Sequence, residues 1–262
     1  MIGPLLLAAA AGAASFLGAV LALVPLRFSH RALLYLLGMS GGYLLTWSVA
    51  HLIPFLVEHD PSLVTWILVG YFGLYVIENL FASHAHPAPS FGDLHGHALV
   101  DSWGEHASAI SPAACWTAAG GLFIHAFFDG VGIVASFGIH PTVGTLVFLA
   151  VLIHKVPEGA SLTSILGAAR QSLRAMIAAA VGTALMTLFG GVAVWALHWA
   201  EPRWSYLLLA LSAGTFLFIG ASNLIPATQK GESRGTVVAV IMGALAFYGV
   251  SLLLQITGIH RG

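Results

Sequence analysis

The chain has 262 residues, of which 58% are hydrophobic and 7% are charged, and its mean hydropathy is +0.93. Since a soluble domain carries about 25% charged residues, this composition excludes an ordinary soluble protein and predicts an integral membrane protein. The net charge of -1 gives no indication of nucleic-acid binding, and the single cysteine, Cys115, excludes an internal disulfide and a thiolate cluster.

Eight apolar stretches are long enough to cross a bilayer, which takes roughly 20 residues each. They cover residues 3–25, 32–56, 62–82, 113–137, 143–167, 172–199, 203–228 and 235–258. We expect the first stretch to be a span rather than a signal peptide, because it is too long and no basic residues precede it. The sequence therefore predicts an all-α membrane protein with eight transmembrane helices.

Basic residues predict the orientation of these spans. The loops after the first, fifth and seventh spans carry Arg27, Arg31, Arg170, Arg174, Lys230 and Arg234, and all three loops fall on one side. The opposite side has only Arg203 and Arg261 as basic residues, together with Glu58, Asp60 and Glu201. Because cytoplasmic loops are enriched in Lys and Arg, both termini are expected outside the cytoplasm.

The segment between the third and fourth spans, residues 83–112, is polar and rich in histidine. Its histidines are His84, His86, His95, His97 and His106. The orientation above makes this loop cytoplasmic, and short His-rich tracts often bind metal. The alternative is a solvated linker in which the histidines have no specific role. No extramembrane segment is long enough for a second domain, so residues 1–262 are expected to form one transmembrane domain.

An internal repeat relates residues 40–54, SGGYLLTWSVAHLIP, to residues 212–226, SAGTFLFIGASNLIP. The second and seventh spans run in opposite directions, so the two copies have inverted topology. Inverted repeats with a substrate site near the midplane are typical of secondary transporters. His51 in the first copy corresponds to Asn223 in the second. The topology puts His51 and Glu58 toward the outside, as candidate residues for metal access, and Asn223 toward the inside.

Two matching pairs of polar residues lie in the fourth and fifth spans. His125 and Asp129 form one pair, His154 and Glu158 form the other, and each pair is four residues apart. That spacing places both members of a pair on one face of a helix. Ionisable residues at membrane depth are costly and usually mark a pathway or a site. We interpret the four as ligands of one metal site; hydrogen bonding between packed helices is the alternative.

Two nitrogen and two oxygen ligands suit borderline divalent metals such as zinc, iron(II), cobalt and manganese. No thiolate is on offer, which argues against copper(I). Pro157 lies beside the ligands in the fifth span. A proline inside a helix frees the carbonyl four residues earlier and kinks the helix. Gly130 and Gly159 directly follow the two acids and permit a close approach of neighbouring helices.

These residues resemble the ZIP (Zrt/Irt-like) family of divalent metal transporters, of the bacterial type. The fifth-span residues His154, Pro157, Glu158 and Gly159 match the family's His-Asn-x-Pro-Glu-Gly-like motif. The eight spans, the His-rich loop, the Gly-Gly…His-Leu-Ile-Pro sequence and the Ala-Gly-Thr-Phe sequence in the seventh span agree as well. The resemblance implies a 3+2+3 arrangement of spans with both termini extracytoplasmic. It also implies an inner exit site near Glu78, His84, His86 and Asn223.

The fourth span departs from that pattern: Asp129 replaces the usual Glu, and Ala126 and Phe128 stand where Asn and Pro are common. Lys155 occupies a position where two-metal members of the family carry an acidic or amide ligand, and the sixth span has no carboxylate. A protonated lysine cannot coordinate a metal. We therefore interpret Lys155 as a charge partner of Asp129 and Glu158, and expect one metal per site. The alternative is that Lys155 points into a water-filled cavity.

The resemblance implies uptake of divalent metal ions toward the cytoplasm, with zinc first and iron, manganese, cobalt or cadmium as other candidates. It implies no enzymatic activity, no cofactor other than the transported metal, and a place in the plasma (bacterial inner) membrane. A homodimer remains one option for the assembled form. Two rival functions stay open on the residues alone. One is a proton-driven carrier of a small organic ion, and the other is an intramembrane metal-dependent hydrolase, although His154-Lys155 lacks the His-Glu-x-x-His pattern of such enzymes.

Overall fold

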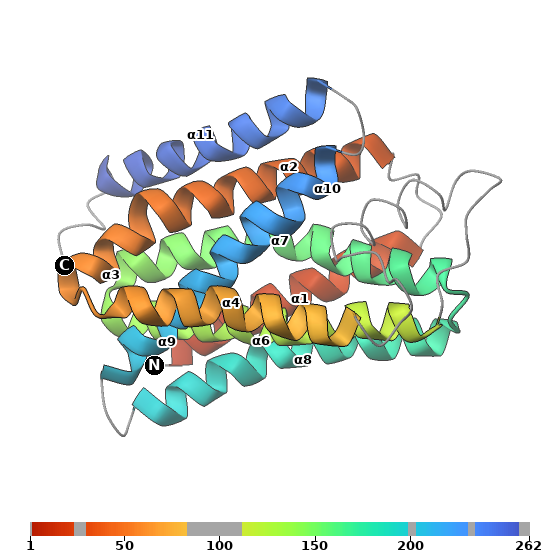
Figure 1. The fold of residues 1–262 in the computed structure, drawn as a ribbon, viewed down its shortest axis with the longest axis horizontal. Coiled ribbons are helices and arrows are strands. Elements are labelled where there is room, and N and C mark those ends of the chain that lie inside the picture. The colour runs from red at the N-terminus through yellow and green to blue at the C-terminus, as the bar shows by residue number, and fades with distance from the viewer. Residues whose placement is uncertain (1, 24–29, 83–111, 199–202, 230–233, 257–262) are drawn as a thin grey trace.

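The computed structural model describes residues 2–23, 30–82, 112–198, 203–229 and 234–256, and every regular element within these ranges is a helix (Figure 1). In chain order the elements are α1 (Ile2–Leu23), α2 (His30–Trp47), η1 (Ser48–Leu52), α3 (Ile53–His59), α4 (Leu63–Ala82), α6 (Pro112–Ile139), α7 (Pro141–Ala168), α8 (Leu173–His198), α9 (Arg203–Phe218), η2 (Ile219–Leu224), α10 (Ile225–Gln229) and α11 (Arg234–Ile256). Because α2, η1 and α3 are continuous, as are α9, η2 and α10, these elements form rods at the positions of the predicted spans.

Seven of these rods are long and apolar enough to cross a membrane, while the apolar part of α4, Leu63–Asn79, is shorter. Large apolar side chains also cover the outside of the bundle, for example Leu185 on α8 and Leu245 on α11, which are 58% and 57% exposed. A helix that is apolar on its outer face as well as its buried face belongs in lipid. The prediction of an all-α, multi-pass integral membrane protein is therefore confirmed.

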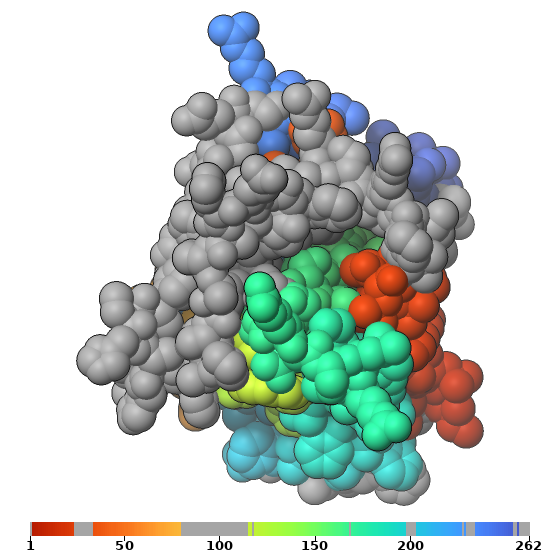
Figure 2. All heavy atoms as spheres, turned by 90° about the vertical axis from the view of Figure 1, so that its right-hand side faces the viewer, coloured from red at the N-terminus to blue at the C-terminus, as the bar shows by residue number. Residues whose placement is uncertain are grey.

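Helix α1 begins and helix α11 ends at the same end of the bundle (Figure 1). The turn between α7 and α8 lies at the opposite end. Figure 2 looks at that opposite end, where this turn (green) lies beside α1 (red). Arg170 lies in this turn and Arg174 lies in the first turn of α8, so the positive-inside rule predicts that this end faces the cytoplasm.

Helices α6 and α7 occupy the middle of the bundle. Helices α1 and α8 pack against both of them, whereas α2 pairs mainly with α11 and α4 mainly with α9. Close backbone approaches hold several of these pairs together. A Cβ atom added to Gly159 of α7 would collide with the Ser15 carbonyl of α1, and one added to Gly130 of α6 would collide with the Thr187 carbonyl of α8. Helices pack this closely in membranes where small residues line the contact.

The two copies of the internal repeat share an unusual backbone feature. The π-helical turns η1 and η2 end one residue before the Ile-Pro pairs that close the two copies, so the turns occupy equivalent positions. The N–H groups of Ile53 and Ile225 bond to the carbonyls of Ser48 and Gly220, five residues back. Proline collides with the carbonyl four residues before it in an α-helix, and a wider turn relieves that collision. The repeat is thus present in the backbone as well as in the sequence.

Candidate metal centre

The four predicted ligands lie at the midpoints of the two central helices. Both α6 and α7 have 28 residues, and only His140 separates them. Counted from Pro112 and Pro141, His125 and His154 are each the fourteenth residue, and Asp129 and Glu158 are each the eighteenth. Proline at the first position starts α7, where its missing N–H costs nothing. Two equal helices joined by one residue run antiparallel, so their midpoints meet.

The structure brings these residues together as the sequence predicts. One ligand atom from each of His125, Asp129, His154 and Glu158 lies within 4.8 Å of the others, and all four side chains are buried. His125 Nε2 lies 3.3 Å from both Asp129 Oδ2 and Glu158 Oε2. His154 Nε2 lies 3.4 Å from Asp129 Oδ2 and 3.9 Å from Glu158 Oε2. Zinc binds His and carboxylate ligands at about 2.0–2.2 Å, so an ion would draw these atoms closer together.

Hydrogen bonding around the cluster prepares it for a cation. His154 Nδ1 lies 2.9 Å from the Ala150 carbonyl, which can only accept, so Nδ1 donates this hydrogen bond and leaves Nε2 as the nitrogen that faces the centre and would bind a metal. A second partner of this kind commonly fixes a metal-binding histidine. The buried atoms Asp129 Oδ1 and His125 Nδ1 have no hydrogen-bond partner within the described part of the chain. Asp129 therefore has acceptor capacity left over.

Lys155 is the fifth charged or titratable member of the cluster. Its Nζ lies 2.7 Å from Asp129 Oδ2 and 2.9 Å from each oxygen of Glu158. The side chain has no exposed surface. It reaches the two carboxylates rather than a water-filled cavity, which is the arrangement that the charge-partner interpretation expects.

Two serines that the sequence reasoning did not single out connect the central helices to the repeat. Because Pro157 has no N–H to donate, the Ile153 carbonyl lacks its normal helical partner. Ser40 Oγ of α2, which is 2.7 Å from the Leu36 carbonyl of its own helix, also lies within hydrogen-bond distance of the Ile153 carbonyl, at 3.3 Å. Ser212 Oγ of α9 donates to the Phe128 carbonyl of α6 at 3.2 Å. Ser40 and Ser212 are the first residues of the two repeat copies. Their equivalent positions in the repeat could have indicated that both serines contact the central helices.

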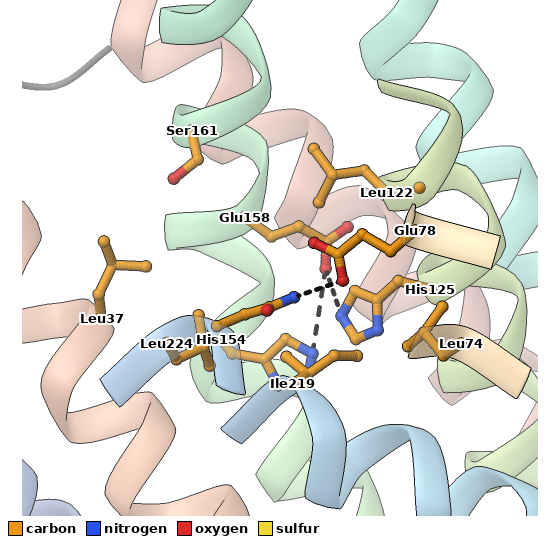
Figure 3. Close-up of a pocket in the computed structure, with 12 residues that line it drawn as sticks. Leu37, Leu74, Glu78, Leu122, His125, His154, Glu158, Ser161, Ile219 and Leu224 are labelled. Atoms are coloured by element: carbon orange, nitrogen blue, oxygen red, sulfur yellow. Dashed lines mark hydrogen bonds and ion pairs between the residues drawn. The ribbon is translucent and has the colours of Figure 1, made fainter. Parts of the chain in front are cut away.

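A pocket extends from the cluster toward the end of the bundle where α7 turns into α8 (Figure 3). It is lined by Leu37, Leu74, Glu78, Gly121, Leu122, His125, His154, Glu158, Ser161, Ile219, Asn223 and Leu224. The space open to the centres of water molecules is about 40 Å³, and about 10–15 Å³ suffices for one water. The pocket can therefore hold several waters in front of His125, His154 and Glu158.

Two of the predicted inner-site residues lie in this pocket. Asn223 of η2 donates a hydrogen bond from Nδ2 to Glu78 Oε2 of α4 at 3.4 Å, and Glu78 points toward the central histidines (Figure 3). The other predicted inner residues, His84 and His86, lie outside the described residues, as do the loop histidines His95, His97 and His106.

The candidates for outer access lie on the other half of the second span. His51 is half-buried in the π-turn η1, with its ring centroid 6.2 Å from that of Phe247 on α11. Glu58 is exposed near the end of α3, two helical turns further along. Neither residue belongs to the central cluster.

The fold and the cluster define a multi-pass helical membrane protein with a buried His and carboxylate centre at mid-depth. Comparison with known families narrows this class. The family model described as ZIP Zinc transporter matches residues 93–256, more than half of the chain. The chain belongs to the ZIP family.

Relatives align along nearly the whole chain. The chain is 26% identical to the zinc transporter ZupT of Salmonella arizonae and 27% identical to that of Escherichia coli O7:K1, with 98% of this chain and 98% of each relative covered. It is also 27% identical to the zinc transporter ZIP9-B of Xenopus laevis, over 81% of this chain and 71% of that protein. Members of this family are transporters, and the chain is accordingly not an enzyme.

Proposed function

We propose that this protein carries divalent transition-metal ions, zinc first, across the membrane toward the cytoplasm. The observation that supports this most directly is the buried cluster of His125, Asp129, His154 and Glu158 at the midpoints of α6 and α7. Buried charged groups are costly in a membrane protein unless they serve a site or a pathway. The relatives that align over nearly the whole chain are named zinc transporters, which supports zinc as the ion.

The proposed ligand set explains which ions compete. Two imidazole nitrogens and two carboxylate oxygens bind borderline metals, so iron(II), manganese, cobalt and cadmium are expected to compete with zinc. The pocket in front of the cluster provides a wet route for release, past Glu78 and Asn223 as an inner exit site. We assign His51 and Glu58 to outer access, and the loop histidines to metal contact on the cytoplasmic side.

We further propose that residues 1–262 form a single transmembrane transport domain, with a cytoplasmic His-rich loop over residues 83–112. Its partners are then the metal ion and the surrounding lipid, with no nucleic acid involved. A homodimer is the assembly we would test first, by cross-linking in membranes. The protein's cellular place is proposed to be the plasma (inner) membrane.

The test is metal uptake into proteoliposomes by the protein with Glu158→Ala and His154→Ala together. Uptake should be abolished while the protein still inserts into the membrane, because two of the four ligands are gone. Ser164→Ala is a matched control, since Ser164 lies on the same helix and bonds only its own backbone, at Ala160 O. Normal uptake by the double variant would contradict the proposed site.

The same assay separates the proposed function from its rivals. A metal transporter gives saturable flux of radioactive zinc that other divalent ions compete away. A proton-driven carrier of an organic ion gives no zinc flux, and an intramembrane hydrolase cleaves substrate without moving metal. Either of these outcomes would overturn the proposal.

A further inference from the structure

The position of Lys155 carries an inference that deepens the proposed function and rests on it. The ammonium group has three N–H donors, and it has three acceptor oxygens: Asp129 Oδ2 at 2.7 Å and the two oxygens of Glu158 at 2.9 Å each. All of its hydrogen bonds are therefore made to the proposed metal ligands. The side chain has no surface exposed to bulk solvent.

Lys155 lies behind the cluster as seen from the pocket. His125, His154 and Glu158 line the pocket, whereas Asp129 and Lys155 do not and are fully buried. The oxygens that face the histidines, Asp129 Oδ2 and Glu158 Oε2, are also the ones that accept from Lys155. An ion arriving from the pocket would meet the two histidines and share these two oxygens with the ammonium group.

The net charge of the cluster shows how Lys155 affects the binding of the metal ion. Asp129 and Glu158 contribute -2 and Lys155 contributes +1, so with neutral histidines the empty cluster carries -1. A bound divalent ion changes this to +1. Without Lys155 the same cluster would change from -2 to 0. Opposite charges at close range attract strongly even in a partly polar surrounding, so the lysine lowers the attraction for the metal and stabilises the empty site.

We propose that Lys155 is a resident cation of the transport site: it holds the carboxylate oxygens that a second metal ion would need, limits the centre to one ion, and weakens the binding of that ion so that it is released. Lys155 is thus a residue that sets affinity and stoichiometry without being a ligand. The metal itself needs no displacement of the lysine, because the two cations approach the carboxylates from opposite sides.

The test measures zinc affinity of the purified protein by competition with a chelator. All variants carry serine in place of His84, His86, His95, His97 and His106, so that the predicted loop sites are removed. Lys155→Met, which keeps the length of the side chain and removes its charge, should bind zinc at least about tenfold more tightly. Structural damage to the site would change affinity in the opposite direction, which makes the gain diagnostic.

Two variants serve as controls. Lys155→Arg keeps the positive charge and should retain the weaker affinity. Lys230→Met removes the same charge from a residue that lies outside the described part of the chain, in a predicted loop, and should leave the affinity unchanged. Equal zinc affinity of the Lys155→Met variant and of the same loop-serine protein with Lys155 retained would overturn the proposal, as would two zinc ions at the centre of the protein that retains Lys155.

A stability measurement tests the proposal even where the Lys155→Met variant is hard to purify free of metal. Lys155→Met leaves two buried carboxylates without their cation, so its unfolding temperature without zinc should fall. Added zinc chloride should then raise the unfolding temperature of Lys155→Met by more than that of the unmodified protein, because tighter binding to the folded state stabilises it more. An equal or smaller rise would count against the proposal.

Failure of this inference can be told apart from failure of the proposed function. If zinc binding by the unmodified protein does not depend on His125 and His154, the transport site itself is wrong. If that binding is lost in His125→Ala and His154→Ala but is not strengthened in Lys155→Met, the site stands and the role of Lys155 is wrong.

Discussion

Asn223 and Glu78 are 145 residues apart in the chain, yet Asn223 Nδ2 donates to Glu78 Oε2 at 3.4 Å inside the pocket that leads away from the central cluster. The contact joins the π-turn η2 to helix α4 across the proposed release route. Among the described residues of this route, Glu78 offers the ion a carboxylate between the central cluster and the end of the bundle.

Glu78→Gln should lower metal uptake several-fold while leaving zinc affinity at the centre unchanged. The amide keeps a hydrogen-bonding oxygen for Asn223 but loses the negative charge that attracts a cation into the pocket. Uptake kinetics in proteoliposomes, compared with equilibrium zinc binding, separate the two effects. Asn79→Ala is the neighbouring control, since Asn79 is exposed and bonds only to Tyr75 of its own helix. Unchanged uptake in Glu78→Gln would remove Glu78 from the pathway.

Gly130→Ala and Gly120→Ala should have opposite effects on stability, although both lie on α6. A Cβ on Gly130 would collide with the backbone of Thr187 on α8, whereas a Cβ on Gly120 has nothing within 4 Å. Overpacking against backbone costs about 1–3 kcal/mol. Alanine at the open position instead favours the helix by up to about 1 kcal/mol. Thermal unfolding in detergent measures both, and equal unfolding temperatures would contradict the packing described above.

Replacing the five loop histidines, His84, His86, His95, His97 and His106, with serine should change the rate or apparent affinity of uptake without abolishing it. They are predicted to contact metal on the cytoplasmic side, far in sequence from the buried ligands. Uptake of zinc against competing divalent ions measures the effect. Complete loss of transport in a well-expressed variant would show that the loop is essential.

Uptake should fall as the external pH becomes acidic, because metal ligands must be deprotonated to bind the ion. Protons then compete with the ion for the buried ligands of the central cluster. The competition weakens as the pH rises, and uptake should recover. Zinc uptake measured between acidic and neutral pH tests this, with the internal pH held constant. A steady rise of uptake toward acidic pH would instead indicate coupling to protons.

The spans and the ligand cluster were predictable because each depends on local sequence. Hydropathy identifies a span without reference to its neighbours, and a four-residue spacing puts His125 beside Asp129 and His154 beside Glu158 wherever the helix lies. The equal lengths of α6 and α7 then bring His125 and His154 to the same depth, with Asp129 and Glu158 on opposite sides of them. The repeat predicted equivalent segments, and the paired π-turns follow from the prolines that end them.

The partners of each helix were harder to predict. In lipid, hydrophobicity does not favour one apolar helix face over another as a partner. The choice of neighbour therefore depends on small residues that allow close contact. The contact of Gly159 with Ser15, which packs the fifth span against the first, has no signal in the hydrophobic pattern. The approach of the Ser40 hydroxyl to the Ile153 carbonyl could be recognised only once α2 and α7 were known to be adjacent. The orientation of the Lys155 side chain was likewise hard to predict, because it is set by contacts with Asp129 on α6 and Glu158 on α7.

The cluster of two carboxylates and one lysine has an electrical consequence. A membrane potential of 100 mV acts on each elementary charge with about 2.3 kcal/mol. The empty cluster, at -1, and the zinc-loaded cluster, at +1, would feel this potential with equal strength and opposite sign. An inside-negative voltage that draws the loaded centre inward would therefore also drive the empty centre back outward. Removing the charge of Lys155 would make the loaded centre neutral and leave only the empty centre responsive to voltage.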